Sequence, residues 1–202
     1  IERQLQIDAG IVNSNQVVKC GMPRLDRFHR WRKSNYINTK HPKILLAFGF
    51  SPNTGLPRIP RKQIRGGNTR FEYLDEKDSQ MKWNNFFSQY HEVLVKIAHD
   101  NPSWQVHLKL KARFRDAEPA IKFVNSLNPP DNFKIFMDSD SFERVVNADV
   151  ICGFNTTGVL EGLAAGLPVV TPEFSEVNEK LMRDFAVNFD AATQIPNDPL
   201  SM

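Results

Sequence analysis

Apolar and polar positions change their pattern near residue 43, where short apolar runs begin to alternate with longer segments of helical periodicity. The apolar runs predict five strands, at residues 44–48, 104–110, 133–137, 149–152 and 169–171. The periodic segments predict helices at residues 79–100, 117–127, 142–147 and 158–165, and one more that ends near residue 185. Strands and helices that alternate in this way predict an α/β protein with a Rossmann-like doubly wound parallel sheet.

The rest of the chain is organised around residues 148–171, which read ADVICGFNTTGVLEGLAAGLPVVT. The pattern predicts a strand, a polar turn, a short helix and a second strand. Gly166 and Pro168 are expected to end the helix, because glycine accepts a left-handed cap and proline cannot continue the helical hydrogen bonds. A helix that starts directly after a strand directs backbone N–H groups toward the carboxyl edge of the sheet, where they favour an anion.

Polar residues at the start of this helix form the first candidate site, and they are Asn155, Thr156, Thr157, Gly158 and Glu161. The two threonine hydroxyls could donate to a phosphate, and the glutamate could accept from a sugar or ribose hydroxyl. The alternative is that a threonine only caps the helix, although no Glu or Gln follows at the capping-box spacing. P-loop chemistry is excluded because the sequence contains no GxxxxGK[ST] motif.

Three cations gather where the predicted strand 104–110 ends, namely Lys109, Lys111 and Arg113. The carboxyl ends of strands form the ligand edge of a doubly wound sheet, so these side chains could meet a phosphate or a diphosphate. The alternative is a solvated basic rim. Lys109 and His107 alternate with the apolar positions of the strand, and we expect His107 on the surface.

Several other segments carry structural expectations. Asp116 and Ser141 are predicted to cap the helices that follow them. Residues 27–40 are basic and polar and predict a linker, with a domain boundary near residue 40. Residues 51–78, rich in proline, glycine and arginine, predict either a mobile loop or a lid that contacts an anion. Residues 190–202 read as a polar tail.

The composition of the 202 residues is that of an ordinary globular protein, with 41% hydrophobic and 24% charged residues. A formal net charge of +3 fits an anionic ligand or a membrane surface without indicating nucleic acid. Two cysteines without a CxxC motif or a histidine cluster predict no metal site and a reducing cytoplasm. No spanning helix or signal peptide is predicted, and the start at Ile1 leads us to expect a piece of a longer protein.

Two segments, VVKCGMPRLD at residues 17–26 and NTTGVLEGLAAGLPVV at residues 155–170, together resemble elements of GT-B glycosyltransferases. The resemblance is to bacterial capsule and surface-polysaccharide transferases and to their relatives, the CDP-glycerol glycerophosphotransferases. In those families a G-x-P-R-x-D element lies between two Rossmann-like domains. A strand-turn-helix with paired hydroxyl residues and a glutamate belongs to the C-terminal domain, which binds the activated nucleotide donor. The resemblance covers roughly residues 15–185.

This resemblance implies a domain organisation and a reaction. Residues 1–40 would be the end of an N-terminal acceptor domain and the interdomain linker, residues 41–190 a nucleotide-sugar-binding Rossmann-like domain, and residues 191–202 a tail. The chain would transfer a sugar from a nucleotide-activated donor to a surface-polysaccharide or lipid-linked acceptor. It would need no metal or other cofactor, because helix dipoles and basic side chains stabilise the leaving phosphate. It would act in the cytoplasm, either free or peripheral at the inner membrane.

By position, the resemblance implies that Thr156 and Thr157 hold donor phosphate and that Glu161 meets donor ribose or sugar hydroxyls. Lys109 or Lys111 stands where relatives carry a basic residue, commonly followed by His-Pro, but this sequence reads LKLKARF. Many retaining relatives also carry a second glutamate seven or eight residues before the one that matches Glu161, and this chain has none there. Neither a retaining mechanism nor a catalytic residue is therefore assigned.

Two other functions remain open on the same sequence. A nucleotide-sugar 2-epimerase also uses a two-domain GT-B-like fold, and it would release free nucleotide slowly without an acceptor. A non-catalytic nucleotide-sugar-binding module would have a degenerate donor domain that anchors a partner.

Overall fold

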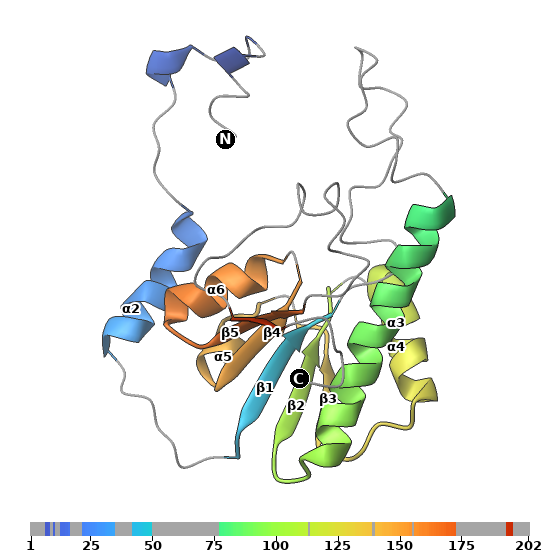
Figure 1. Cartoon of the computed structure of the whole chain (residues 1–202). Coiled ribbons are helices and arrows are strands. Elements are labelled where there is room, and N and C mark those ends of the chain that lie inside the picture. Colours follow the sequence, from blue (N-terminus) through green and yellow to red (C-terminus); the bar gives the residue numbers. More distant parts are fainter. Residues whose placement is uncertain are drawn as a thin grey trace.

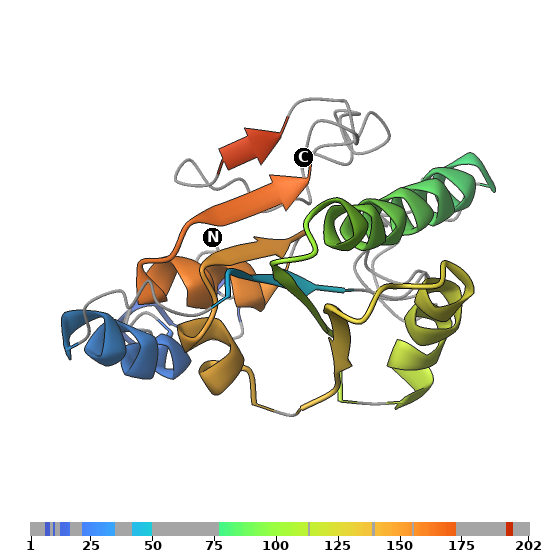
Figure 2. The same ribbon diagram turned by 90° about the horizontal axis from the view of Figure 1, so that it is seen from below.

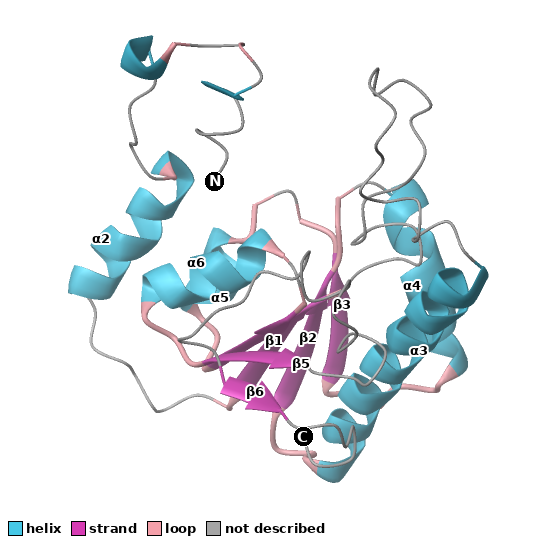
Figure 3. Ribbon diagram, turned by 45° about the horizontal axis from the view of Figure 1, so that its top comes forward, coloured by secondary structure: helices cyan, strands magenta, loops and turns pink. Residues whose placement is uncertain are grey.

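The computed structural model of the chain describes residues 7–8, 10, 13–16, 22–34, 42–49, 77–112, 114–138, 140–154, 156–172 and 193–195. A parallel sheet forms the central layer of this part of the chain, with helices on either side (Figures 1 and 3). Its strands are β1 Ile44–Phe48, β2 Gln105–Lys109, β3 Phe133–Phe136, β4 Val150–Gly153, β5 Val169–Pro172 and β6 Thr193–Ile195.

The strand order is β3-β2-β1-β4-β5-β6, and every neighbouring pair is parallel. β1 occupies the middle, where Leu45 lies opposite both Val106 of β2 and Val150 of β4. The chain first builds outward from β1 through β2 to β3, and then crosses back to place β4 on the other side of β1. The gap between the carboxyl ends of β1 and β4 is therefore the topological switch point of the sheet, where ligands of doubly wound folds bind.

Two groups of helices cover opposite faces of the sheet (Figure 2). One face carries α3 Lys77–Asp100 and α4 Phe114–Ser126, and the other carries α2 Asp26–Ser34, α5 Phe142–Val146 and α6 Thr157–Ala165. Alternate residues of β1 point to opposite faces of the sheet. Leu45 and Ala47 belong to the core under α3, while Leu46 and Phe48 belong to the core under α6. The prediction of a Rossmann-like doubly wound parallel sheet is confirmed.

The predicted strands and helices between residues 43 and 172 are present, with bounds that differ by at most three residues. Asp116 does not precede its helix, because α4 begins at Phe114 and includes it. The helix α6 ends before Gly166, whose φ of 78° gives the left-handed cap that glycine was expected to provide. Among the described residues, no helix is long and apolar enough to cross a membrane.

The first part of the predicted linker at residues 27–40 is helical, because Asp26–Ser34 is the helix α2, and its place between two domains remains a prediction. The scarcity of apolar positions, Phe28 and Trp31 alone, explains why the sequence pattern did not reveal it. Phe28 is fully buried against α5 and α6, while most other side chains of α2 are polar. Preceding this helix, Pro23–Leu25 forms a short 3₁₀ helix, η2. Within the predicted polar tail, Thr193–Ile195 forms the strand β6 beside β5.

Other expectations concern residues that the structure does not describe. They include almost all of the loop at 51–78 and the helix predicted to end near residue 185. The apolar run at residues 17–20 and the amphipathic pattern before Gly10, which predict a strand and a helix, also lie wholly or mostly outside the described residues. The domain boundary near residue 40 also remains a prediction.

Candidate functional site

The turn between β4 and α6 places two threonines at the start of a helix. Thr156 has extended backbone angles and is the N-cap of α6, and its hydroxyl accepts a hydrogen bond from the Gly158 backbone at 3.4 Å. Thr157, the first helical residue, is exposed. Capping, which the sequence left as an alternative, is thus observed for Thr156, and the Thr157 side chain faces solvent.

Glycine at position 158 lets the start of α6 approach the end of β1. A Cβ atom built on Gly158 would lie 2.4 Å from the ring of Phe48, the last residue of β1. The Phe48 carbonyl in turn accepts a hydrogen bond from the Tyr90 hydroxyl at 3.1 Å, and Gly49 donates its backbone N–H to the Lys109 carbonyl at 3.0 Å. These contacts bring the ends of β1 and β2 and the start of α6 to one place.

A cleft of about 450 Å³ opens there, and we call it the switch-point cleft. It is lined by Arg24, Phe48, Gly49, Lys109, Leu110, Lys111, Ala112, Asp138, Ser141, Thr156, Thr157, Gly158 and Glu161. The structure brings together six of the seven residues that the sequence nominated, from two separate segments. The seventh, Asn155, and the neighbouring cation Arg113 lie outside the described residues.

Lys109 was expected to face solvent, but it is only 7% exposed. Its ammonium group donates to the Leu110 carbonyl at 2.6 Å, and the residue lines the cleft. Burial lowers the pKa of Lys109, while the carboxylates of Asp138 and Glu161 act in the opposite direction. A lysine ammonium has three donors, so Lys109 retains capacity for an anion. Lys111 is exposed at the cleft.

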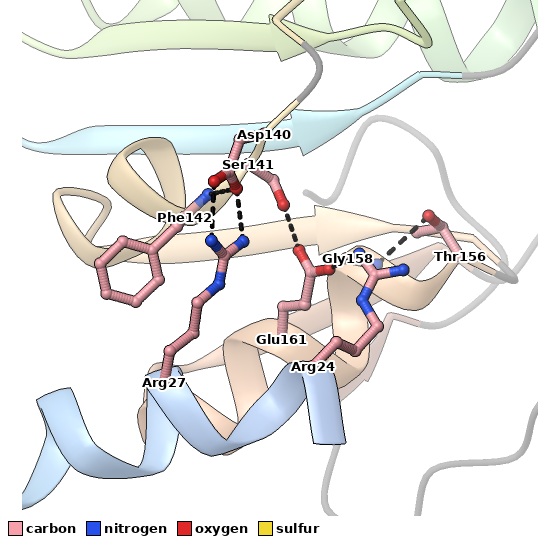
Figure 4. Close-up of polar contacts among 8 residues, drawn as sticks. All are labelled: Arg24, Arg27, Asp140, Ser141, Phe142, Thr156, Gly158 and Glu161. Carbon is pink, nitrogen blue, oxygen red and sulfur yellow. Dashed lines mark hydrogen bonds and ion pairs between the residues drawn. The ribbon is translucent and has the colours of Figure 1, made fainter. Parts of the chain in front are cut away.

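Glu161 is buried, with only 1% of its side chain exposed, although its charge makes burial costly. Arg24 of η2 forms an ion pair with one carboxylate oxygen. The Ser141 hydroxyl donates to the other oxygen. Figure 4 shows both partners converging on Glu161 from different elements. Ser141 therefore makes no side-chain cap for α5, contrary to the prediction.

The cap of α5 comes from the preceding residue. Asp140 accepts a hydrogen bond from the Phe142 backbone at 2.9 Å, and it also forms a bidentate pair with Arg27 of α2 (Figure 4). The Arg27 guanidinium, followed by the Phe142 N–H, lowers the pKa of Asp140 to about 2. The same pair raises the pKa of Arg27. α2 is thus attached to the start of α5 by a charged contact.

A second pair lies at the edge of the cleft. The Arg144 guanidinium donates to Asp138 at 2.6 Å and lies over the ring of Phe136, 3.5 Å from its centroid. The hydrogen bond from Arg144 is the main reason that the pKa of Asp138 is lowered. His107 is half-buried against the same ring rather than fully at the surface, and burial lowers its pKa.

Arg24, Asp138 and Ser141 line the cleft without having been nominated as ligand residues from sequence. Arg24 had an available signal, because it is the arginine of the G-x-P-R-x-D element. The other two follow β3, at the same carboxyl edge as Lys109. Among the described residues, no group of three or more His, Cys, Asp or Glu side chains is placed to hold a metal ion.

No family model and no curated protein matches the sequence. Among solved structures, Thermosulfurimonas dismutans "KpsC, beta Kdo 2,7 transferase" is similar at 16% identity and a TM-score of 0.38, covering 88% of this chain and 46% of that one. "KpsC, beta Kdo 2,4 transferase" from the same organism is similar at 14% identity and a TM-score of 0.36, covering 75% and 45%. This chain therefore spans about half the length of these proteins. Both of these proteins are named as transferases, the class that the sequence motifs resemble.

Proposed function

We propose that this chain is the donor-binding part of a GT-B glycosyltransferase, and that its switch-point cleft binds the phosphate end of a nucleotide-activated sugar. The observation that carries the proposal is the meeting of Lys109, Lys111 and the N-terminus of α6 in one cleft. Parallel α/β sheets bind nucleotides at this place, and both helix N-termini and cations favour phosphate. The G-x-P-R-x-D and NTTGVLEG segments supply the resemblance to glycosyltransferases.

The charges in the cleft support an anionic ligand. Both carboxylates already have an arginine partner, Glu161 with Arg24 and Asp138 with Arg144. Among the described residues, neither Lys109 nor Lys111 forms an ion pair with a carboxylate. These two ammonium groups would stabilise the negative charge that develops on the phosphate when the sugar leaves.

The proposed reaction transfers a sugar to a surface-polysaccharide or lipid-linked acceptor. The nucleotide leaves the sugar at the donor site. We therefore assign donor binding and stabilisation of the leaving nucleotide to this site. No catalytic base is assigned to the described residues, because Glu161 and Asp138 are held by arginines. We propose that the base and the acceptor site belong to a further domain, with residues 1–40 as its end and its linker.

The direct test is calorimetry of the full chain with CMP, CDP, UDP, GDP and TDP. Binding of at least one nucleotide is expected, with a rise in melting temperature that corresponds to about 2.7 kcal/mol at a hundred times the dissociation constant. Lys109→Met and Lys111→Ala should each weaken that binding about 10-fold or more. Lys122→Ala is the matched control, because Lys122 is an exposed lysine on α4 outside the cleft lining.

Absence of binding to all five nucleotides would refute the donor site. If a nucleotide binds and both cleft variants retain native affinity, the cleft is not the site. The chain is then incubated with the activated sugar of the tightest-binding nucleotide, and release of free nucleotide is measured with and without acceptor. Release only in the presence of acceptor supports a transferase. Slow release without acceptor supports the epimerase, and binding without release supports a non-catalytic module.

A further inference from the structure

Arg24 reaches the switch-point cleft from η2, outside the sheet, and its partner Glu161 belongs to α6 (Figure 4). We infer that Arg24 contacts the ligand phosphate directly, and that Glu161 is a positioning residue that holds the Arg24 guanidinium at the cleft. This inference rests on the proposed function and reverses the role that the sequence suggested for Glu161. The ribose or sugar hydroxyls would then be bound elsewhere in the cleft.

Burial argues against a direct contact between Glu161 and a hydroxyl of the ligand. Only 1% of its side chain is exposed, and each carboxylate oxygen already accepts from a protein donor. A ligand hydroxyl would have to displace Ser141 or Arg24 to reach the carboxylate. Removing a partner from a buried charge is unfavourable, so these internal contacts are expected to persist when the ligand binds.

Arg24, in contrast to the buried Glu161, is accessible to a ligand, since 53% of its side chain is exposed. The ion pair with Glu161 uses the terminal nitrogen Nη2. A guanidinium has five N–H donors in a planar fork, so one carboxylate contact leaves donors for a phosphate. Anchoring by a buried carboxylate also restricts the long side chain, which reduces the conformational entropy that binding would otherwise remove.

The platform beneath Arg24 is fixed by two further contacts. Two residues after η2, Arg27 pairs with Asp140 at the start of α5. Phe28 is fully buried between α2 and the helices α5 and α6. Because η2 continues directly into α2, the Arg24 backbone is held beside the cleft rather than on a free segment. The contacts therefore preorganise a third cation, besides Lys109 and Lys111, at the cleft.

The test compares ligand atoms as well as residues. The tightest binder among CMP, CDP, UDP and GDP is titrated into the full chain, together with its nucleoside and its 2′-deoxy form. Arg24→Gln should weaken nucleotide binding about 10- to 100-fold and leave nucleoside binding unchanged, as expected for a lost charge-assisted contact to phosphate. Arg30→Gln, an exposed arginine of α2 outside the cleft lining, is the matched control and should bind like the native chain.

Glu161→Gln separates positioning from direct contact. A positioning role predicts a smaller loss of nucleotide affinity, about 3- to 10-fold, and an unchanged ratio between ribo and deoxy ligands. Arg24→Gln leaves the Glu161 carboxylate buried without its cation and should lower the melting temperature. The double variant Arg24→Gln/Glu161→Gln should recover much of that loss, because the buried charge is gone, while nucleotide affinity stays low.

Three outcomes would overturn the inference. Native nucleotide affinity in Arg24→Gln would exclude a phosphate contact while leaving the proposed function intact. Loss of the ribo-to-deoxy discrimination in Glu161→Gln would restore Glu161 as the ribose contact. Absence of nucleotide binding by the native chain would refute both the donor site and the role of Arg24.

Discussion

The ring of Phe48 at the end of β1 lies directly against Gly158 at the start of α6, with no space for a Cβ atom on the glycine. This contact joins the central strand to the helix whose N-terminus borders the switch-point cleft. A short distance between the two elements is thus a structural requirement of the cleft, and glycine at position 158 satisfies it.

Gly158→Ala is therefore expected to push the start of α6 away from β1. The new methyl group would lie 2.4 Å from ring atoms of Phe48, so either the ring or the helix must move. Overpacking of this kind costs about 1–3 kcal/mol, although alanine itself favours the helix. Urea unfolding of the native and variant chains measures the difference. Phe48→Leu/Gly158→Ala should recover part of it, and an additive double variant would contradict the steric explanation.

Hydrophobic patterning predicted the doubly wound fold because nearly every strand is a continuous apolar run. The helix from Lys77 to Asp100 shows the same strength of signal, since its buried residues repeat on one face. Most of the candidate site followed from topology as well. The carboxyl ends of parallel strands meet at one edge, so the placement of Lys109 and Thr157 near each other required no knowledge of side-chain contacts.

The remaining features depend on contacts between distant segments, which periodicity does not encode. α2 reads as polar because Phe28 and Trp31 are its only apolar residues, and its docking depends on α5 and α6. Glu161 has the sequence character of an exposed ligand residue. Only the approach of Arg24 and Ser141, 137 and 20 residues away, makes its burial tolerable.

His91 makes the stability of the fold depend on pH. It is fully buried in α3, and desolvation lowers its pKa from 6.5 to about 4. In the unfolded chain His91 therefore becomes protonated near pH 6.5, whereas in the folded chain it becomes protonated only near pH 4. The free energy of unfolding should fall as pH decreases through this window, by about 3 kcal/mol in total, and should be fully present above pH 6.5.

Urea unfolding at several pH values between 7.5 and 4.5 measures this slope. His91→Phe should flatten it, because the variant keeps the aromatic packing against Phe87 and does not titrate. His107, whose pKa is also lowered by partial burial, should leave a shallower slope of the same sign. His99→Gln, an exposed position on the same helix, should keep the native slope. An unchanged slope in His91→Phe would exclude His91 as its source.

Asp140 should contribute more through the cap of α5 than through its ion pair. Its carboxylate accepts from the Phe142 backbone at 2.9 Å, whereas the pair with Arg27 is largely exposed, which limits its energy. Asp140→Ala is expected to cost about 1–2 kcal/mol, and Asp140→Asn, which retains the acceptor for the cap, less than half of that. Chemical unfolding near pH 7 checks both values. Equal losses in the two variants would identify the charge, rather than the cap, as the main contribution.

The two threonines at the start of α6 should respond differently to loss of their hydroxyl groups. Thr156 accepts a hydrogen bond from the Gly158 backbone, so Thr156→Ala should lower stability by about 1 kcal/mol and Thr156→Ser should restore it. Thr157 is exposed on the first turn and lines the cleft. Thr157→Ala should therefore change stability by less than about 0.5 kcal/mol but weaken nucleotide binding several-fold.

Thermal unfolding and nucleotide calorimetry on the same four proteins separate the two roles. The expected pattern is a stability loss confined to Thr156→Ala and an affinity loss in Thr157→Ala. Native affinity in Thr157→Ala would show that its hydroxyl does not reach the phosphate. The N-terminus of α6 would then act on the ligand through its backbone N–H groups and dipole alone. If Thr156→Ala/Thr157→Ala also binds like the native chain, neither hydroxyl of this turn contacts the ligand.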